Sequence, residues 1–232
     1  YEKYVFNAVT RIVSVSEEDK ERIINDFKIS KAKIVVISNG VDIDYFNGSL
    51  SFVEKEKEIV FTGSMYAYPN QQGLSFFMKE VFPILLKQYK NIKFHIVGDN
   101  PSEQIKSYHD NKNVFVTGKV KDVRPYLRRS AIAIVPLFIG GGSRLKILEA
   151  LSMGIPVVST SIGCEGLHLQ NNKNILIADT KEEFIESIQK LFSFGRFYEK
   201  IITNGQELAQ NLYNWDSIAN NLNALLIEEM RK

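Results

Sequence analysis

The chain has 232 residues, a length that suits one large domain or one domain with part of a second. Hydrophobic residues make up 44% and charged residues 24%, as in globular proteins with a substantial core. A formal net charge of +2 argues against a nucleic-acid-binding surface, and a single cysteine excludes an intramolecular disulfide framework. No apolar run is long enough to span a membrane and no signal peptide is recognisable, so we expect a cytoplasmic protein. The sequence begins with Tyr1 instead of Met, which suggests a piece of a longer protein.

The first part of the chain predicts two strands separated by a helix. Residues 11–16 and 33–38 are β-branched runs of strand length. Ser16, followed by three acidic residues, has the composition of a helix N-terminus. Residues 41–58 predict a loop that ends in a charged run, and we place a domain boundary within it, after residue 48.

A regular alternation of strands and helices follows this loop. Short apolar runs predict six strands, at residues 58–63, 92–98, 114–118, 131–136, 156–160 and 174–178. Helices are predicted between most of them, at residues 69–89, 102–109, 122–129 and 143–153. Strands that are apolar on both faces indicate a Rossmann-like, doubly wound parallel α/β sheet covered by helices on both sides.

Glycines stand where several of these strands end. Gly63, Gly98 and Gly118 each follow a strand, and ligands of such sheets bind at the carboxyl ends of the strands. The last part of the chain is helical. Thr180 with Glu183 forms a capping box, a second helix covers residues 196–211, and Asn214 caps a final one.

Residues 140–154, GGGSRLKILEALSMG, are the most informative stretch. Gly140, Gly141 and Gly142 follow a predicted strand, and glycines let the backbone come close to a ligand. Ser143 is a suitable N-cap for the helix that follows, and a helix N-terminus attracts phosphate. The stretch therefore predicts a strand, a glycine loop and a helix that together bind an anion.

The first turn of this helix carries two cations, Arg144 and Lys146, around Leu145. Cations at a helix N-terminus oppose its dipole, and a bound anion would offset that cost. Glu149, one turn further, is close enough to accept hydrogen bonds from sugar hydroxyls. The alternative is a flexible loop followed by a solvated Lys146–Glu149 pair. We expect the Lys146 side chain at the surface.

Taken together, the motifs resemble a known family. The segments are SNGVDIDYF (38–46), FTGSMYAYPN (61–70), FHIVGDNP (94–101), VTGKVKDVRPYL (116–127), GGGSRLKILEALSMGIPVVST (140–160) and GCEGL (163–167). In order and spacing they resemble the nucleotide-sugar-binding half of GT-B glycosyltransferases, in particular the retaining group 1, or family 4, enzymes. The resemblance implies that residues 1–48 are the last part of an N-terminal acceptor-side domain and that residues 49–212 form the donor-binding domain. It also implies that residues 213–232 form a helix that crosses back to the N-terminal domain.

The resemblance also assigns roles to the loops at the strand ends. Gly63 and Ser64 match the loop that faces the donor diphosphate, and Gly98 with Asp99 matches the turn after the second strand of that domain. The loop beside the nucleobase is matched by Gly118, Lys119 and Val120.

The glycine loop matches the family's contacts to phosphate and donor sugar. These contacts are implied for Gly140, Gly141, Gly142, Ser143, Arg144, Leu145 and Lys146. Glu149 matches the second glutamate of a paired motif and would hold the ribose hydroxyls. We take Arg144, Lys146 and Glu149 as the candidate catalytic residues.

Two positions depart from the family pattern. The first glutamate of the paired motif is Gly141 here. The arginine and lysine common in the loop after the first strand are replaced by Ser64 and Asn70, so we interpret Arg144 and Lys146 as substitute phosphate cations.

The implied function is transfer of a sugar from a nucleotide-diphosphate sugar to an acceptor hydroxyl in glycan or polysaccharide biosynthesis. The implied partners are that donor, a glycan or lipid-linked acceptor and an N-terminal domain that could associate with the inner face of a membrane. No metal or other cofactor is implied. A nucleotide-sugar-binding module without catalysis, or another GT-B enzyme such as a sugar-nucleotide epimerase, stays open as an alternative.

The remaining chemically interesting side chains point to ordinary roles. His95 lies inside a predicted strand and is expected to be a hydrogen-bonded core residue, while His109 and His168 are expected at the surface. Cys164 is expected to be packed. Tyr66 and Tyr68 could line the sugar site or cover the sheet edge. The histidines and the cysteine lack metal-ligand spacing.

Overall fold

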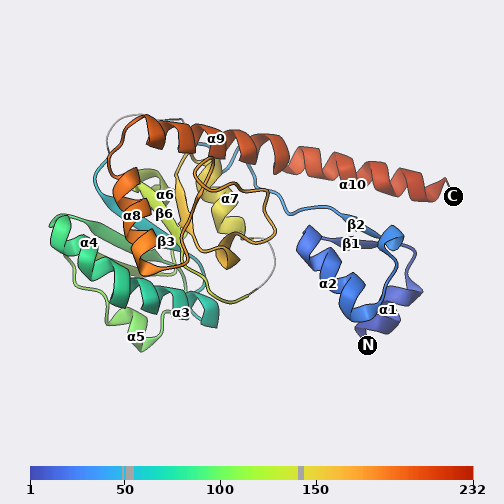
Figure 1. Cartoon of the computed structure of the whole chain (residues 1–232), viewed down its shortest axis with the longest axis horizontal. Coiled ribbons are helices and arrows are strands. Elements are labelled where there is room, and N and C mark those ends of the chain that lie inside the picture. Colours follow the sequence, from blue (N-terminus) through green and yellow to red (C-terminus); the bar gives the residue numbers. More distant parts are fainter. Residues whose placement is uncertain (49, 51–54, 141–143, 232) are drawn as a thin grey trace.

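The computed structural model describes residues 1–48, 50, 55–140 and 144–231. It contains a large unit and a smaller N-terminal unit, with one long helix running between them (Figure 1). The N-terminal unit consists of α1 (Glu2–Ala8), β1 (Ile12–Ser14), α2 (Glu17–Phe27), a 3₁₀ turn (Lys31–Lys33) and β2 (Ile34–Val36). Its two strands are parallel, and α2 is capped by the predicted Ser16, whose hydroxyl accepts from the backbone N–H of Asp19.

The large unit is built on a six-stranded sheet with the order β5-β4-β3-β6-β7-β8. Its strands are β3 (Glu58–Thr62), β4 (Lys93–Val97), β5 (Val114–Gly118), β6 (Ile132–Val135), β7 (Val157–Ser159) and β8 (Leu176–Ile177). Every neighbouring pair is parallel. The predicted doubly wound parallel sheet is therefore confirmed.

Helices cover both faces of this sheet (Figure 1). They are α3 (Tyr68–Phe76), α4 (Phe82–Gln88), α5 (Glu103–Lys106), α6 (Arg124–Arg129), α7 (Leu145–Ser152), α8 (Lys181–Leu191) and α9 (Arg196–Leu212), with a short 3₁₀ turn at Ile162–Cys164. Successive strand side chains point to opposite faces. Ile59 and Phe61 accordingly join one hydrophobic core, with α3, α4 and α8, while Val60 between them joins the other, with α7.

Two predicted helices differ in detail from the structure. The helix expected at 69–89 is interrupted by a π-helical turn (Phe77–Val81) directly before Pro83, which lacks the N–H that a regular helix needs. The helix expected from Ser143 begins at Leu145 with Arg144 in the N-cap position, and the proposed cap Ser143 lies outside the described residues. The sequence analysis also missed α1.

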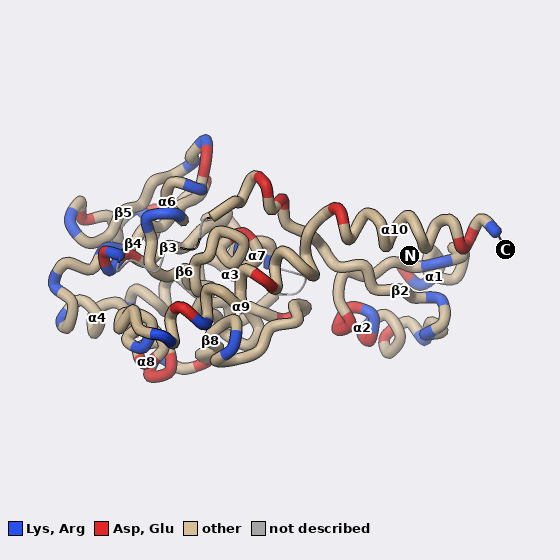
Figure 2. Tube along the Cα trace, turned by 90° about the horizontal axis from the view of Figure 1, so that it is seen from above, with Lys and Arg blue, Asp and Glu red and all other residues tan. Residues whose placement is uncertain are grey.

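The two units are joined by two stretches of chain that lie side by side. α10 (Trp215–Met230) follows α9 and runs along the N-terminal unit in both Figure 1 and Figure 2. Where the stretches meet, the backbone N–H of Val41 donates to the carbonyl of Tyr213 at 2.7 Å. Near the other end of α10, Arg11 forms an ion pair with Glu229 at 2.8 Å. The domain boundaries at 48/49 and 212/213 stay predictions.

The winding of the large sheet reverses between β3 and β6. From β3 the chain continues outward to β4 and β5, and from β6 it continues in the other direction to β7 and β8. Ligands of open α/β sheets bind at such a switch point, at the carboxyl ends of the strands. The loops after β3 and β6 are therefore where a site is expected.

Candidate functional site

Side chains from both halves of the sheet meet at this switch point. Lys146 in the first turn of α7, which follows β6, donates to the Oδ1 atom of Asn70 at 3.2 Å. Asn70 lies in the first turn of α3, which follows β3, and its Nδ2 donates to the carbonyl of Ser64 at 2.7 Å. Two candidate residues that are 76 positions apart in the sequence are thus in direct contact.

Gly63 provides the space for this contact. A Cβ atom built on Gly63 would lie 2.6 Å from Nζ of Lys146 and 3.0 Å from Nδ2 of Asn70, and the φ angle of +151° is one that other residues rarely adopt. Gly98 packs against the same loop, because a Cβ atom there would overlap the carbonyl oxygen of Gly63. The strand-end glycines Gly63 and Gly98 are required by close packing, as well as being near the predicted ligand.

The expectation that Lys146 lies at the surface is wrong. Its side chain is half-buried, with Nζ 4.2 Å from the ring centroid of Phe61. Burial removes water from the ammonium and Arg144 repels it, and together they lower its pKa to about 7. A negatively charged ligand beside Lys146 would raise its pKa again and favour the protonated ammonium.

Arg144 is the second cation of the site. It occupies the N-cap position of α7, and a Cβ atom on Gly140 would lie 2.5 Å from its guanidinium. Burial lowers the pKa of Arg144, and the nearby carboxylate of Glu165 partly opposes this shift. The positive end of the α7 dipole points into the same space as the two cations, which favours an anion there.

Glu149 lies one turn along α7 from Lys146. It is half-buried, and burial raises the pKa of its carboxyl while Lys146 partly offsets this effect. Ligand hydroxyl groups are suitable partners for such a group.

Other candidate residues are placed at the same edge without direct contact to these side chains. Asp99 is held through its backbone, since its carbonyl accepts from the N–H of Met65 at 2.9 Å. The side chains of Ser64 and Leu145 are exposed. Gly140 is described, whereas the predictions for Gly141, Gly142 and Ser143 fall outside the described residues.

Gly118 and Val120 lie apart from this group. Gly118 has a φ angle of +68°, and a Cβ atom built on it would meet nothing within 4 Å. The half-buried Val120 packs against the α7 side of the core. Their assignment to the nucleobase therefore stays a prediction.

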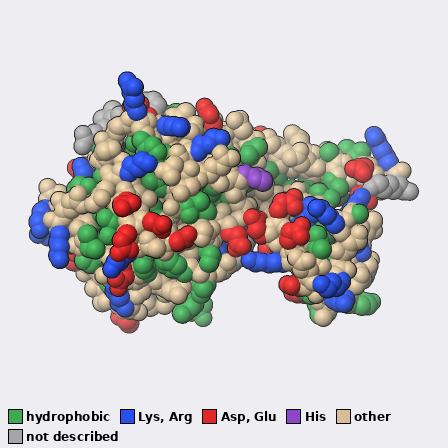
Figure 3. All heavy atoms as spheres, in the orientation of Figure 1, with side chains coloured by type: hydrophobic (Ala, Val, Ile, Leu, Met, Phe, Trp, Pro, Cys, Tyr) green, Lys and Arg blue, Asp and Glu red, His purple; other side chains and the backbone are tan. Residues whose placement is uncertain are grey.

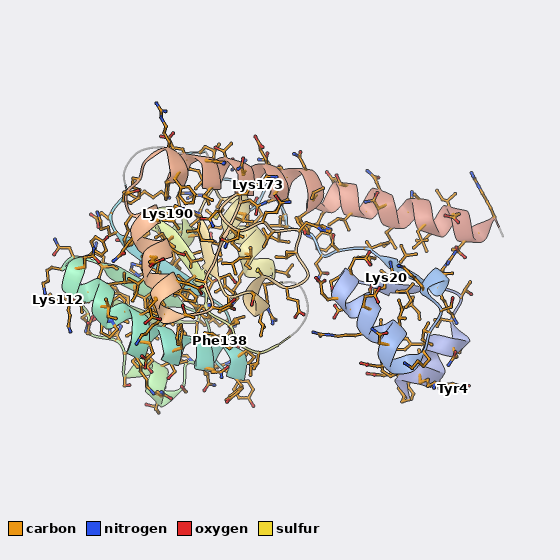
Figure 4. All side chains as sticks on the ribbon, viewed as in Figure 1. Tyr4, Lys20, Lys112, Phe138, Lys173 and Lys190 are labelled. Carbon is orange, nitrogen blue, oxygen red and sulfur yellow. The ribbon has the colours of Figure 1, made fainter. Side chains whose placement is uncertain are left out.

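Phe61 is the site residue that the sequence analysis missed. It belongs to the core strand β3 and is fully buried, so its sequence context shows only a hydrophobic position. On the rim of the site, Phe138 packs edge-on against Phe76 of α3, with ring centroids 4.8 Å apart (Figure 4). Tyr66 and Tyr68 are 79% and 66% exposed, which excludes the alternative that they cover the sheet edge.

The remaining histidines and the cysteine behave as expected. His95 is buried at the amino end of the sheet, where Nε2 pairs with Oε2 of Glu58 at 3.1 Å and Nδ1 accepts from Arg129 at 2.7 Å. His109 and His168 are exposed. Cys164 is buried, and burial raises its pKa to about 11, so it is no nucleophile.

One hollow of the described chain lies away from this site. It has a volume of about 840 Å³ and is lined by residues at the amino ends of β3 and β4, among them Lys55, Lys57 and Lys93. Lys112, another of its residues, stands at the end of the large unit farthest from the N-terminal unit (Figure 4). This lysine-rich hollow lies at the edge of the sheet opposite the switch point.

A smaller hollow lies between the two units. It has a volume of about 250 Å³ and is lined by the start of α2, including Glu17 and Glu18, and by Gly166 to His168. Figure 3 shows acidic side chains on both sides of this junction. An ion pair between Arg22 and Glu165, at 3.1 Å, also links the units.

Within the described residues, no group of three His, Cys, Asp or Glu side chains could hold a metal ion. The described helices also include none that is long and apolar enough to cross a membrane.

A doubly wound parallel sheet with a helix N-terminus and two cations at its switch point is the arrangement in which many α/β proteins bind ligands. Comparison with known families makes this class more specific. Residues 56–193 match the family model for group 1 glycosyl transferases, and residues 1–45 match that for glycosyltransferase family 4. The chain belongs to the group 1 glycosyl transferases, and its fold is that of the GT-B enzymes.

Individual relatives agree with this assignment. One is the UDP-Gal:alpha-D-GlcNAc-diphosphoundecaprenol alpha-1,3-galactosyltransferase of Escherichia coli, 26% identical, with 83% of this chain aligned to 51% of the relative. Another is the capsular polysaccharide biosynthesis glycosyltransferase CapM of Staphylococcus aureus, 24% identical over 100% of this chain and 66% of the relative. The crystal structure of Anabaena HepE in complex with UDP is 15% identical with a TM-score of 0.78, covering 98% of this chain and 68% of that one.

This chain spans only about half the length of the curated relatives, between 41% and 66% of each of those named above and of a Klebsiella pneumoniae protein encoded in the cps region.

Proposed function

We propose that this chain is the donor-binding part of a retaining glycosyltransferase that acts in polysaccharide biosynthesis. The observation that carries the proposal is the hydrogen bond from Lys146 to Asn70. It lies beside Gly63, at the switch point of the sheet and at the N-terminus of α7. The proposed donor is a nucleotide-diphosphate sugar. The HepE structure, which contains UDP, supports a nucleotide of this kind.

In this function the diphosphate lies at the start of α7. Arg144 and Lys146, together with the backbone N–H groups of the first turn, neutralise the charge that develops on the diphosphate as it leaves the sugar. Glu149 accepts hydrogen bonds from the ribose hydroxyls. The charge is met by side chains and the helix terminus, so we propose that no metal ion is required.

The acceptor hydroxyl would be presented by an N-terminal domain, and the hollow between the units marks the direction from which it would approach. The acceptor of the Escherichia coli relative is a diphosphoundecaprenol-linked sugar. A glycan or lipid-linked acceptor, and a place of action in the cytoplasm at the inner face of the membrane, belong to the proposal.

The second candidate is a binding module that holds a nucleotide sugar without transferring it. The replacement of a motif glutamate by Gly141 favours this reading. The two candidates differ when the protein with its N-terminal domain is assayed for donor turnover, since only the transferase consumes the donor in the presence of an acceptor.

The test of donor binding is calorimetric titration of the chain with UDP, GDP and ADP and their sugars, on the wild type and on Gly63→Ala. We expect one nucleotide to bind, and we expect Gly63→Ala to abolish binding because its Cβ collides with Lys146 and Asn70. Gly195→Ala is the control, because a Cβ atom there meets nothing within 4 Å and Gly195 stands at the start of α9, in none of the candidate loops, so it should leave binding unchanged. Absence of binding to all three nucleotides would contradict the proposed function.

A further inference from the structure

We propose that Asn70 is a positioning residue of the donor site, which holds the Lys146 ammonium beside Gly63 and across the junction between the two halves of the sheet. The structure thereby assigns Asn70 a role through Lys146 instead of a direct contact to the donor. The inference rests on the proposed function only for the identity of the anion that Lys146 meets.

The orientation of the Asn70 amide is fixed by its surroundings. Asn70 is 9% exposed, and its backbone N–H donates to the carbonyl of Ala67 at 3.0 Å. Nδ2 donates to the carbonyl of Ser64, so Oδ1 must face Lys146 as an acceptor. A flipped amide would lose both hydrogen bonds.

The Asn70 side chain fixes the position of the Lys146 ammonium without neutralising its positive charge. The charged groups that act on Lys146 are Arg144 and Glu149, which belong to α7 and its cap. The neighbouring strand and helix contribute Phe61, Gly63 and Asn70, none of which is ionised. An aspartate in place of Asn70 would still accept from Lys146, but it would lose the hydrogen bond to the Ser64 carbonyl and cancel the charge that the donor diphosphate needs.

This arrangement couples donor binding to a proton. Burial and Arg144 lower the pKa of Lys146 to about 7 in the ligand-free protein. A bound diphosphate raises that pKa, so binding takes up a proton above pH 7. The affinity for nucleotide should fall as the pH rises, by up to tenfold per pH unit, the limit for uptake of one proton.

The experiment is titration of the chain with UDP between pH 6.5 and 9, for wild type, Asn70→Asp, Asn70→Ser and a control. Asn113→Ser is the control, because Asn113 is also buried and amide-bonded, with Nδ2 2.7 Å from the carbonyl of Ile92, but lies at the opposite edge of the sheet. We expect Asn70→Asp to bind UDP at least tenfold more weakly at pH 7 and to move the midpoint of the pH profile upward by about one unit. Asn70→Ser should weaken binding at every pH, and the control should lower the melting temperature while keeping the wild-type profile.

A second readout separates this inference from the proposed function. The ¹³Cε resonance of Lys146 is followed by NMR in the ligand-free wild type and the Asn70 variants, where its pKa should rise in Asn70→Asp. Failure of UDP to bind the wild type would refute the proposed function, while the NMR titration would still decide the role of Asn70. An unchanged Lys146 pKa in Asn70→Asp, or an equal shift in the Asn113 control, would overturn the inference.

Discussion

Lys146 is a charge placed where it weakens the ligand-free fold. An unfolded chain leaves this lysine with its ordinary pKa of 10.5, whereas the folded protein lowers it to about 7. Between these values the unfolded state binds more protons, so the stability of the fold rises with pH through this window and the full penalty is present below pH 7. We therefore expect Lys146 to contribute to ligand binding at a cost in the stability of the ligand-free fold.

Lys146→Met keeps the length and apolar stem of the side chain while it removes the charge. We expect the melting temperature of the ligand-free protein to rise at neutral pH, because a poorly solvated cation beside Arg144 is gone. Nucleotide binding should weaken by roughly 1.5–3 kcal/mol, the range for hydrogen bonds to charged groups. Differential scanning calorimetry and isothermal titration measure the two effects. A variant that is less stable and binds normally would contradict both expectations.

A second prediction about a single residue concerns Glu149. If its carboxylate accepts from the ribose, a 2′,3′-dideoxynucleotide should bind at least tenfold more weakly than the ribonucleotide, because it leaves a half-buried polar group without a partner. Glu149→Gln should reduce this discrimination. Competition binding with the two nucleotides is the measurement, and equal affinities would remove Glu149 from the site.

The sequence was sufficient to locate Gly63, Gly98, the two cations and Glu149 at one edge of a sheet. It could not show that Lys146 is half-buried, because that depends on Phe61 and Asn70, which reach it from the neighbouring strand and helix. The spacing of residues within one segment predicts which of them share a helix face. It does not predict contacts between segments that are far apart in the sequence, because those contacts form only when the sheet packs.

Among the secondary-structure elements, β3 and β4 share a buried charge cluster at their amino ends. Burial alone would raise the pKa of Glu58, but hydrogen bonds from His95 and Lys93 outweigh this effect and lower the pKa to about 2. Arg129 adds a contact to the Glu58 carboxylate at 3.3 Å. The cluster ties the two strands to α6 at the edge of the sheet opposite the site.

Because the folded pKa of Glu58 lies below its ordinary value of 4.5, its contribution to stability is fully present above pH 4.5 and is lost as the pH falls toward 2. We expect Glu58→Gln to lower the free energy of unfolding by about 3 kcal/mol at pH 7 and to flatten the acid limb of the stability profile. Urea unfolding at a series of pH values tests this. Glu103→Gln is the control, since Glu103 forms an exposed pair with Lys106 and should change little.

The strands were predicted because their apolar runs are short and β-branched, and all eight form where expected. The helices were harder to delimit. α1 has no buried residue and no capping side chain, so neither periodicity nor a start signal reveals it. Pro83 predicts a bend in the long helix, and the structure has a π-helical turn, Phe77–Val81, just before it.

For the molecule as a whole, we predict that this chain binds nucleotide but transfers no sugar. Without a partner domain nothing holds the acceptor hydroxyl near the donor, and the loss of that proximity is worth on the order of 7–11 kcal/mol. The assay is donor turnover with sugar and lipid-linked acceptors, with this chain alone and with the upstream domain restored. Equal transfer by both would contradict the prediction.

Several apolar side chains of the chain are exposed to solvent on α10. The side chains of Trp215, Leu226 and Met230 on α10 are 46%, 53% and 86% exposed, so this helix presents apolar surface to solvent. In contrast, Ile23, Ile24 and Phe27 are half-buried against the small core of the N-terminal unit. A strand pair and two helices are enough to cover that edge.

The joint at Val41 and Tyr213 has a mechanical consequence. The chain leaves the N-terminal unit and returns to it through two segments that are hydrogen-bonded to each other at that point. Gly40 lies so close to α10 that a Cβ atom would come within 2.8 Å of the Trp215 ring. Two connections that are hydrogen-bonded to each other restrict the relative movement of the two units more than a single flexible connection would. The joint that imposes this restriction lies apart from the residues of the candidate site.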